Sequence, residues 1–121
     1  MRRGQAPLVL LVEDDQDIRE SLSELIESQG VRVKAACDGI EGLDLLRAGL
    51  KPRAVFLDSR MPRLDGAGVL AAMREDPALV PIPVVWMSGD RRQPPVVAAH
   101  LEKPFDVDAL VVVLGALCEA D

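Results

Sequence analysis

Apolar residues along the chain fall into two patterns. Short unbroken runs, typical of strands that are buried on both faces, occur at residues 8–12, 54–57 and 82–87. An alternating run at 31–35 predicts a less buried strand, and a short fifth strand is expected near 99–102. Together these segments predict five strands.

Between these runs, apolar residues recur every three or four positions, which is the spacing of a helix with one buried face. The helical segments cover residues 18–26, 40–46 and 69–73, and a last helix runs from about residue 106. Glycine or proline follows each of the first three segments and predicts its end. Strands that alternate with helices of this length predict one α/β domain over residues 1–121, with a parallel sheet covered on both faces.

The connection between the fourth and fifth predicted strands is unusually short. Residues 90–98 must make the whole crossover, and they include Pro94 and Pro95. A parallel crossover usually takes a dozen or more residues, and paired prolines exclude a helix interior. We therefore expect the helix between these two strands to be shortened to one turn or missing.

The composition limits the class of protein without specifying it. A chain of 121 residues, of which 49% are hydrophobic, is large enough for one core without covalent staples. Cys37 and Cys118 are far apart in the sequence and are expected to be free thiols, as in a cytoplasmic protein. The formal net charge of −6 argues against direct nucleic-acid binding, and no segment has the pattern of a membrane span or a signal peptide.

Polar residues follow four of the predicted strands where each one ends. Glu13 and Asp14 follow the first strand, Asp58 the third, Ser88 the fourth and Lys103 the fifth. Because the carboxyl ends of parallel strands meet at one edge of a sheet, we expect these side chains to converge. Three converging carboxylates repel one another unless a cation lies between them, and oxygen ligands without a nearby histidine suit Mg²⁺ or Mn²⁺. A lysine and a serine hydroxyl beside such a metal are suited to a phosphoryl group.

These residues belong to four short motifs that are highly specific in combination. The motifs are Val12-Glu13-Asp14, Asp58 with Met61-Pro62 and Asp65-Gly66, Ser88-Gly89, and Lys103-Pro104-Phe105. With them, the chain resembles a response-regulator receiver domain over essentially its whole length. The resemblance implies a flavodoxin-like fold, a doubly wound five-stranded parallel sheet of strand order 2-1-3-4-5. It also implies a cis peptide bond between Lys103 and Pro104.

The resemblance implies a signalling switch rather than an enzyme, although such a domain assists its own phosphorylation and hydrolysis. A sensor histidine kinase or a phosphotransfer protein would phosphorylate Asp58, and a conformational change would relay the added charge. The implied Mg²⁺ ligands are Asp14, Asp58 and the backbone carbonyl of Arg60, with Glu13 acting through water. The implied phosphoryl ligands are Ser88, Lys103 and the Gly89 amide.

The sequence departs from the receiver pattern near this site. His100 stands three residues before Lys103, where the family has a Tyr or Phe switch residue. A lone histidine there is either a partly exposed strand residue or a sensor. The short crossover replaces a full helix that normally belongs to the signalling face. Arg60 and Asp90 are expected to pair across the entrance to the site and to affect the lifetime of the phosphoryl group.

The last predicted helix has no charged residue between positions 109 and 118. One face is expected to pack on the sheet: Val107, Leu110, Val111, Leu114 and Cys118. The opposite face is expected to form an apolar strip: Ala109, Val112, Val113 and Ala116. Such a strip is typical of an interface, so we expect a homodimer or an effector contact there. The alternative is a small patch of short side chains that needs no partner.

Three other functions fit parts of this pattern. The first is a receiver-like interaction module that signals without phosphorylation, because the changes at residue 100 and in the crossover interrupt the relay. The second is a metal-dependent aspartyl-phosphate phosphatase, but such enzymes carry a second Asp two residues after the acceptor, where this chain has Arg60. The third is a flavin-binding domain, whose cofactor phosphate the acidic residues 13–15 would repel. The receiver interpretation accounts for the most residues.

Overall fold

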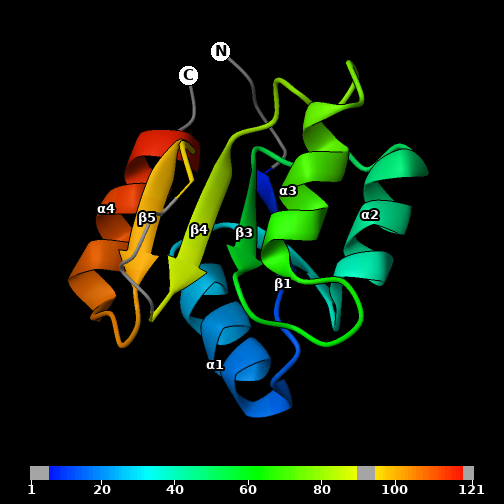
Figure 1. Ribbon diagram of the computed structural model, residues 1–121. Coiled ribbons are helices and arrows are strands. Elements are labelled where there is room, and N and C mark those ends of the chain that lie inside the picture. The colour runs from blue at the N-terminus through cyan, green and yellow to red at the C-terminus, as the bar shows by residue number, and fades with distance from the viewer. Residues whose placement is uncertain (1–5, 90–94, 119–121) are drawn as a thin grey trace.

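The computed structural model describes residues 6–89 and 95–118, which form a five-stranded sheet with helices on both faces (Figure 1). All neighbouring strands are parallel, and their order in the sheet is β2-β1-β3-β4-β5. The predicted doubly wound α/β fold and its strand order are therefore confirmed. The elements in chain order are β1 (Leu8–Val12), α1 (Gln16–Glu27), β2 (Arg32–Ala36), α2 (Gly39–Arg47), β3 (Ala54–Asp58), α3 (Gly66–Arg74), β4 (Val84–Ser88), β5 (Ala99–Glu102) and α4 (Val107–Cys118).

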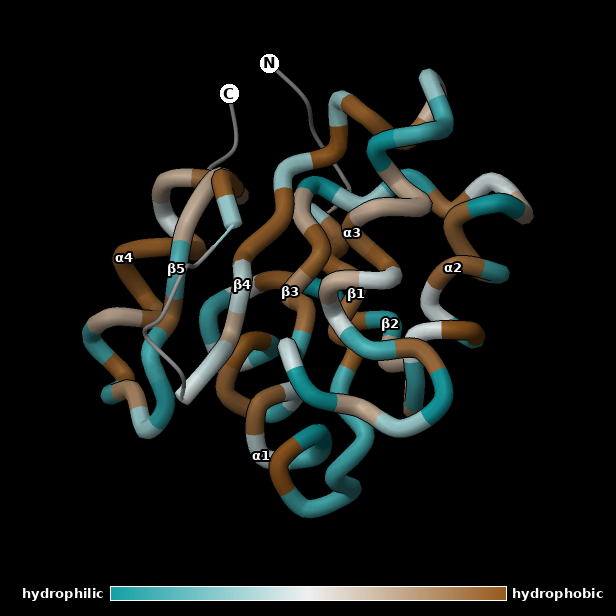
Figure 2. Tube along the Cα trace, in the orientation of Figure 1, coloured by the Kyte–Doolittle hydropathy of each residue, from teal (hydrophilic) through white to brown (hydrophobic). Residues whose placement is uncertain are grey.

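Two hydrophobic cores lie on opposite faces of the sheet, because successive residues of a strand point to opposite sides. On β3, Val55 and Leu57 pack into the core that α2 and α3 cover, whereas Ala54 and Phe56 pack into the core that α1 and α4 cover. Figure 2 shows apolar residues concentrated along the central strands. Burial on both faces explains why these strands are unbroken apolar runs in the sequence.

An aspartate stands directly before each of the described helices, at the carboxyl edge of the sheet. The carboxylates of Asp15, Asp38, Asp65 and Asp106 each accept a hydrogen bond from the backbone N–H three residues later, over 2.8–3.1 Å. This contact satisfies one of the N–H groups that a helix leaves unpaired in its first turn. Four acidic residues at this edge thus serve the fold and set where the loops after the strands end.

The connection from β4 to β5 contains no helix in the part that the structure describes. β4 ends at Ser88 and β5 begins at Ala99, and residues 95–98 are not helical. The Ala98 N–H donates to the Val84 carbonyl over 3.1 Å, so this segment leads directly into the pairing of β5 with β4. The expected shortening of the crossover helix agrees with this arrangement. Residues 90–94 lie outside the described residues.

β4 begins at Val84, two residues later than the apolar run predicts. Pro83 has no N–H to donate, and the Ile82 N–H donates to the Leu79 carbonyl in a turn over 3.0 Å. Ile82 nevertheless packs against the core under α2 and α3. The apolar run therefore includes a core residue that lies before the first residue of the strand.

The buried face of α4 differs in part from the prediction. Leu110, Leu114 and Cys118 pack into the core as expected. Val107 and Val111, expected on the same face, are 50% and 36% exposed. The prediction for these two valines was wrong.

The outward strip of α4 is correspondingly narrower than predicted. Ala109 and Val113 are half-buried against the core, whereas Val112 and Ala116 are exposed, as expected. Helical spacing places residues 109 and 113 on one flank of the buried positions 110, 114 and 118, and residues 107 and 111 on the other flank. Either flank could be buried with them. The contact of the helix with the sheet decides which flank is buried, and the sequence pattern does not contain that information.

The Lys103–Pro104 peptide bond is cis, as the resemblance implied. Cys37 is exposed, Cys118 is buried, and both are free thiols. Among the helices in the described ranges, none has the length and apolar content needed to span a bilayer.

Substitutions on α4 should separate its buried from its exposed face. Leu114→Ala removes a side chain that is 3% exposed and should lower the free energy of unfolding by about 2–5 kcal/mol. Val112→Ala, at a position that is 71% exposed, should change it by less than about 0.5 kcal/mol. Urea unfolding followed by far-UV circular dichroism measures both values. Equal losses in the two variants would contradict the assignment of the faces.

Candidate functional site

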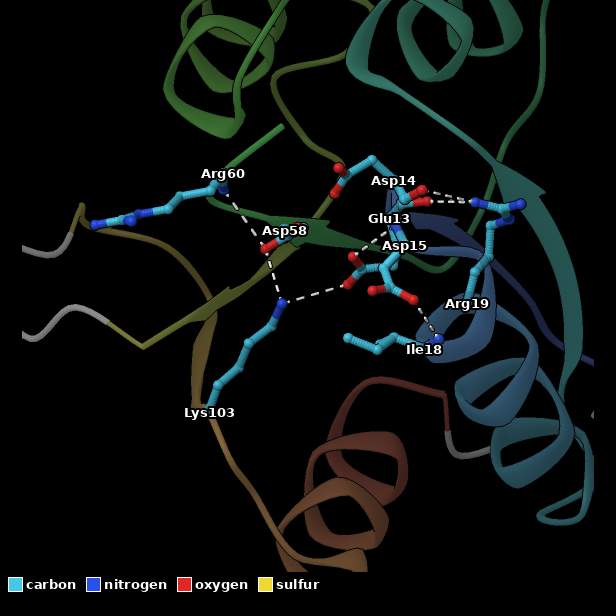
Figure 3. Close-up of polar contacts among 8 residues, drawn as sticks. All are labelled: Glu13, Asp14, Asp15, Ile18, Arg19, Asp58, Arg60 and Lys103. Carbon is cyan, nitrogen blue, oxygen red and sulfur yellow. Dashed lines mark hydrogen bonds and ion pairs between the residues drawn. The ribbon is translucent and has the colours of Figure 1, made fainter. Parts of the chain in front are cut away.

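Glu13, Asp14 and Asp58 meet at the carboxyl edge of the sheet (Figure 3). Glu13 and Asp14 directly follow β1, Asp58 is the last residue of β3, and the two strands are neighbours. One carboxylate oxygen from each residue lies within 4.8 Å of the other two. Glu13 and Asp58 are only 1% and 4% exposed, whereas Asp14 is exposed. The cluster therefore combines two buried acids with one that solvent reaches.

Lys103 reaches this cluster from the end of β5. Its Nζ lies 3.0 Å from Asp58 Oδ1 and 3.4 Å from Glu13 Oε1. Burial alone would lower the pKa of Lys103, but the hydrogen bond and charge of Asp58, together with Glu13, outweigh burial and raise that pKa. Lys103 is therefore a fixed positive charge. One lysine still leaves the three carboxylates with an excess of negative charge.

The pKa of Glu13 is raised to about 7. Burial contributes most, and the negative charge of Asp58 adds to it. The Asp15 N–H, 3.2 Å from Glu13 Oε2, and the Lys103 ammonium act in the opposite direction. A buried carboxyl group that resists ionisation beside other acids favours a further positive charge in the site.

The donor set of this cluster fits a hard divalent cation. Three carboxylates offer oxygen atoms at a spacing that one ion can bridge. The single histidine of the chain, His100, is not among these donors. Oxygen ligands without nitrogen or sulfur suit Mg²⁺ better than zinc.

Ser88 and Gly89 lie at the end of β4, between the strands that lead to Asp58 and Lys103. The Lys103 N–H donates to the Ser88 carbonyl over 2.8 Å, which joins the ends of β4 and β5. Ser88 is 8% exposed. A Cβ atom at Gly89 would meet nothing closer than 3.9 Å, so no neighbour requires glycine there. Both residues lie at the edge of the sheet where the sequence predicted them.

The loop after Asp58 turns back tightly against β3. A Cβ atom at Gly66 would lie 2.6 Å from the Asp58 carbonyl oxygen and 2.9 Å from Ser59 Cα, so this close approach requires glycine. The Arg60 N–H donates to Asp58 Oδ1 over 3.5 Å, and Figure 3 shows the Arg60 side chain extending away from the acids. Asp90, the expected partner of Arg60, lies outside the described residues.

Two supporting contacts were not predicted from the sequence. Arg63, which has a left-handed backbone conformation with φ 68°, forms an ion pair with the buried Asp38 that caps α2. Arg19 of α1 donates hydrogen bonds to the backbone carbonyls of Glu13 and Asp14. Both arginines stand five residues after a site acid, which is the only signal that the sequence offers. It does not show which group such a long side chain reaches.

His100 is an exposed residue of β5. It pairs in register with Trp86 of β4, and its Nε2 lies 2.9 Å from the Pro95 carbonyl oxygen. The histidine therefore contacts the crossover segment. This position agrees with the interpretation of His100 as an exposed strand residue.

An apolar groove of about 550 Å³ lies beside Lys103, between α1 and the connection from β5 to α4. Lys103 lines the groove and also contacts Asp58, so the groove lies next to the acidic cluster. The apolar residues that line the groove include Ile18, Leu22, Leu25, Pro104 and Phe105.

Comparison with known sequences connects this geometry with one family. The family model of the response regulator receiver domain matches residues 9–114. Response regulator MprA of Mycobacterium sp. (strain KMS) is 39% identical over 114 residues, and MprA of Mycobacterium avium (strain 104) is 37% identical over 114 residues. Both matches cover 90% of this chain but only 49% and 50% of the relatives. The chain thus spans about half the length of these curated relatives.

Solved structures share the fold. The receiver domain of the Francisella response regulator 1452 has a TM-score of 0.83 and 27% identity, covering 93% of this chain and 97% of that one. A putative response regulator from Chloroflexus aurantiacus J-10-fl has a TM-score of 0.87 and 24% identity, covering 96% and 100%. The receiver domain of sensor histidine kinase PA1611 from Pseudomonas aeruginosa PAO1, solved with a magnesium ion in its active site cleft, has a TM-score of 0.83 and 23% identity, covering 96% and 100%. The last two likenesses show the fold alone.

The raised pKa of Glu13 predicts how the stability of the metal-free protein depends on pH. The folded state keeps a proton that the unfolded state loses, so this contribution is complete below about pH 4.5 and is lost as pH rises through about 7. Glu13→Gln should therefore gain stability relative to wild type across that window, by about 1–3 kcal/mol above pH 7. Urea unfolding in EDTA measures the difference. Glu27→Gln, an exposed position on α1, serves as the matched control. Parallel pH profiles for wild type and Glu13→Gln would refute this prediction.

Proposed function

The chain belongs to the response regulator receiver domain family, and we propose that it is a phosphorylation-dependent signalling switch with Asp58 as the phosphoryl acceptor. One observation carries this proposal. The buried Asp58 carboxylate lies 3.0 Å from the Lys103 ammonium and in the same cluster as Glu13 and Asp14. Phosphoryl transfer depends mostly on positioning and on neutralising charge, and a lysine beside a cation-binding cluster can supply both.

Mg²⁺ would be held by the carboxylates of Asp14 and Asp58 and by the backbone carbonyl of Arg60, with Glu13 acting through water. When bound, the ion neutralises negative charge on the phosphoryl oxygens. The crowding of three carboxylates and the raised pKa of Glu13 support this assignment. Asp14 is the exposed member of the cluster and gives the ion a path from solvent.

In the transfer step, a carboxylate oxygen of Asp58 attacks the phosphorus of a phosphohistidine. The P–N bond breaks, its electron pair stays with the histidine nitrogen, and an aspartyl phosphate forms. The Lys103 ammonium would pair with one phosphoryl oxygen, while the Ser88 hydroxyl and the Gly89 N–H would donate to others. Because Asp58, Ser88 and Lys103 lie at the carboxyl ends of β3, β4 and β5, the phosphoryl group would join the ends of three strands.

The switch would act through the same groups. The phosphoryl group carries about −1.5 to −2 charges and competes with Glu13 for Lys103, whose Nζ is now 3.4 Å from Glu13 Oε1. The bond from the Lys103 N–H to the Ser88 carbonyl couples the end of β5 to the end of β4. A shift of Lys103 would therefore move the segments that follow both strands, which are the crossover after β4 and α4 after β5. The domain is regulatory, and it assists both its own phosphorylation and the hydrolysis of the resulting aspartyl phosphate.

We further propose that a sensor histidine kinase or a phosphotransfer protein docks on the apolar groove beside Lys103. The donor must bring its phosphohistidine within bonding distance of Asp58, so its surface has to cover the rim of the site. The groove lies beside Lys103, which contacts Asp58, and its lining is mostly apolar. The outward face of α4, with Val112 and Ala116, is the proposed contact for a homodimer or an effector.

Asp58→Asn should abolish phosphorylation. Incubation with acetyl phosphate and Mg²⁺ should add one phosphoryl group to wild type and none to this variant, because the amide is a poor nucleophile. Mass spectrometry of the intact protein measures the addition. Asp44→Asn, an exposed position on α2, is the control and should be labelled like wild type. Unchanged labelling of Asp58→Asn would reject the acceptor, and unlabelled wild type would favour an interaction module that signals without phosphate.

Ile18→Asp should weaken transfer from a protein donor without affecting transfer from a small one. Ile18 lines the groove and is 39% exposed, so a charge there disturbs docking more than folding. Transfer from a phosphotransfer protein that labels wild type should slow by about tenfold, equivalent to about 1.4 kcal/mol. Ile40→Asp, which is 43% exposed on α2, is the control. Labelling by acetyl phosphate should be unchanged in both variants. Equal transfer to both variants would place the docking surface elsewhere.

A further inference from the structure

Arg19 holds the backbone of two acids in the candidate site. It lies at the start of α1 and is half-buried. Its Nη1 donates to the Glu13 carbonyl over 2.9 Å and to the Asp14 carbonyl over 3.4 Å. In Figure 3, the Arg19 guanidinium lies on the side of Asp14 that faces away from Asp58. Its contacts with these acids are thus made to their peptide groups.

The segment between β1 and α1 is fixed from several sides. The Glu13 N–H donates to the Ala36 carbonyl of β2 over 3.1 Å, and the Asp15 N–H donates to Glu13 Oε2 over 3.2 Å. Asp15 also caps α1. The two bonds from Arg19 hold the carbonyls of Glu13 and Asp14. Because a peptide group is planar, the direction of each carbonyl fixes the backbone from which the side-chain carboxylate projects.

We propose that Arg19 is a positioning residue that keeps the carboxylates of Glu13 and Asp14 in the arrangement that binds the divalent cation. This inference rests on the proposed function, because it concerns the same metal site. Loss of a contact that orients metal ligands commonly lowers metal affinity by about 10–100-fold. Arg19 acts through the backbone and touches neither the ion nor the phosphoryl group. Its loss should therefore change metal affinity and leave the transfer step itself intact.

Two substitutions separate the position of Arg19 from its charge. Arg19→Gln removes both the charge and the reach of the side chain. Arg19→Lys keeps the charge, but the lysine side chain is one bond shorter and lacks the planar guanidinium. If the direction of the two carbonyls is what matters, lysine should resemble glutamine at this position.

The test compares the metal affinity of wild type, Arg19→Gln, Arg19→Lys and Arg47→Gln in the full chain. Arg47 is an exposed arginine at the end of α2 and provides the matched control. The electron paramagnetic resonance signal of free Mn²⁺ measures Mn²⁺ binding, and competition measures Mg²⁺ binding. Both Arg19 variants should bind both ions about tenfold more weakly than wild type, and Arg47→Gln should match wild type. Labelling of the Arg19 variants by acetyl phosphate should need about tenfold more Mg²⁺ and reach the wild-type rate at saturation.

Urea unfolding without metal is measured in parallel, so that affinities are compared among folded proteins. Wild-type affinity in Arg19→Gln would overturn the inference and leave Arg19 a role in stability alone. Wild-type affinity in Arg19→Lys, with a loss in Arg19→Gln, would overturn it in favour of a charge effect. If wild type bound neither ion, the proposed function would fail and the inference with it. Weaker binding confined to the two Arg19 variants supports it.

Discussion

The arrangement of the site depends on one electrostatic contact, the Lys103 ammonium between the carboxylates of Asp58 and Glu13. Parallel pairing brings the ends of all strands to one edge, so the acids that follow β1 and β3 are forced together. Their burial makes the repulsion between them costly, and Lys103 offsets only part of it. In the proposed mechanism, the uncompensated charge is what attracts the metal ion, and the ion in turn makes the site acceptable to a phosphoryl group.

This contact reaches across the sheet. β5 is the shortest of the described strands, with four residues, and β4 is its neighbour in the sheet. The residue immediately after β5 nevertheless pairs with the acid at the end of the central strand β3. The edge strand and the sheet centre are therefore linked both through the backbone of β4 and through one side chain. In the proposed switch, a change of charge at Asp58 acts directly on the end of the edge strand β5, from which the chain leads to α4.

The sequence predicted most of the fold, and it predicted that the polar residues at the strand ends lie at one edge of the sheet. Unbroken apolar runs located the strands, and parallel topology then placed Glu13, Asp14, Asp58, Ser88 and Lys103 at one edge. The prediction was wrong where packing chooses between equivalent patterns. On α4, helical spacing did not distinguish the flank with Val107 and Val111 from the flank with Ala109 and Val113.

Contacts made by long arginine side chains were also not predicted. The hydrogen bonds from Arg19 reach two carbonyls five and six residues earlier in the chain. The ion pair of Arg63 with Asp38 joins two loops that are 25 residues apart and that only the folded sheet brings together. No residue pattern marks the acceptors of the Arg19 bonds, because every residue has a carbonyl. The role of Pro83 at the start of β4 is different. Its missing N–H is visible in the sequence, and a residue without a donor is typical of a strand's boundary and not of its interior.

The division of the interior into two cores has a consequence for optical measurements. The single tryptophan, Trp86, belongs to the core that α2 and α3 cover, while its neighbours Val85 and Met87 belong to the core that α1 and α4 cover. The sheet thus separates the one indole from half of the molecule. Its fluorescence is an intrinsic reporter for one layer of the protein only. Coincident unfolding transitions by tryptophan emission and by circular dichroism would show that the two layers unfold as one cooperative unit, and separate transitions would show that they do not.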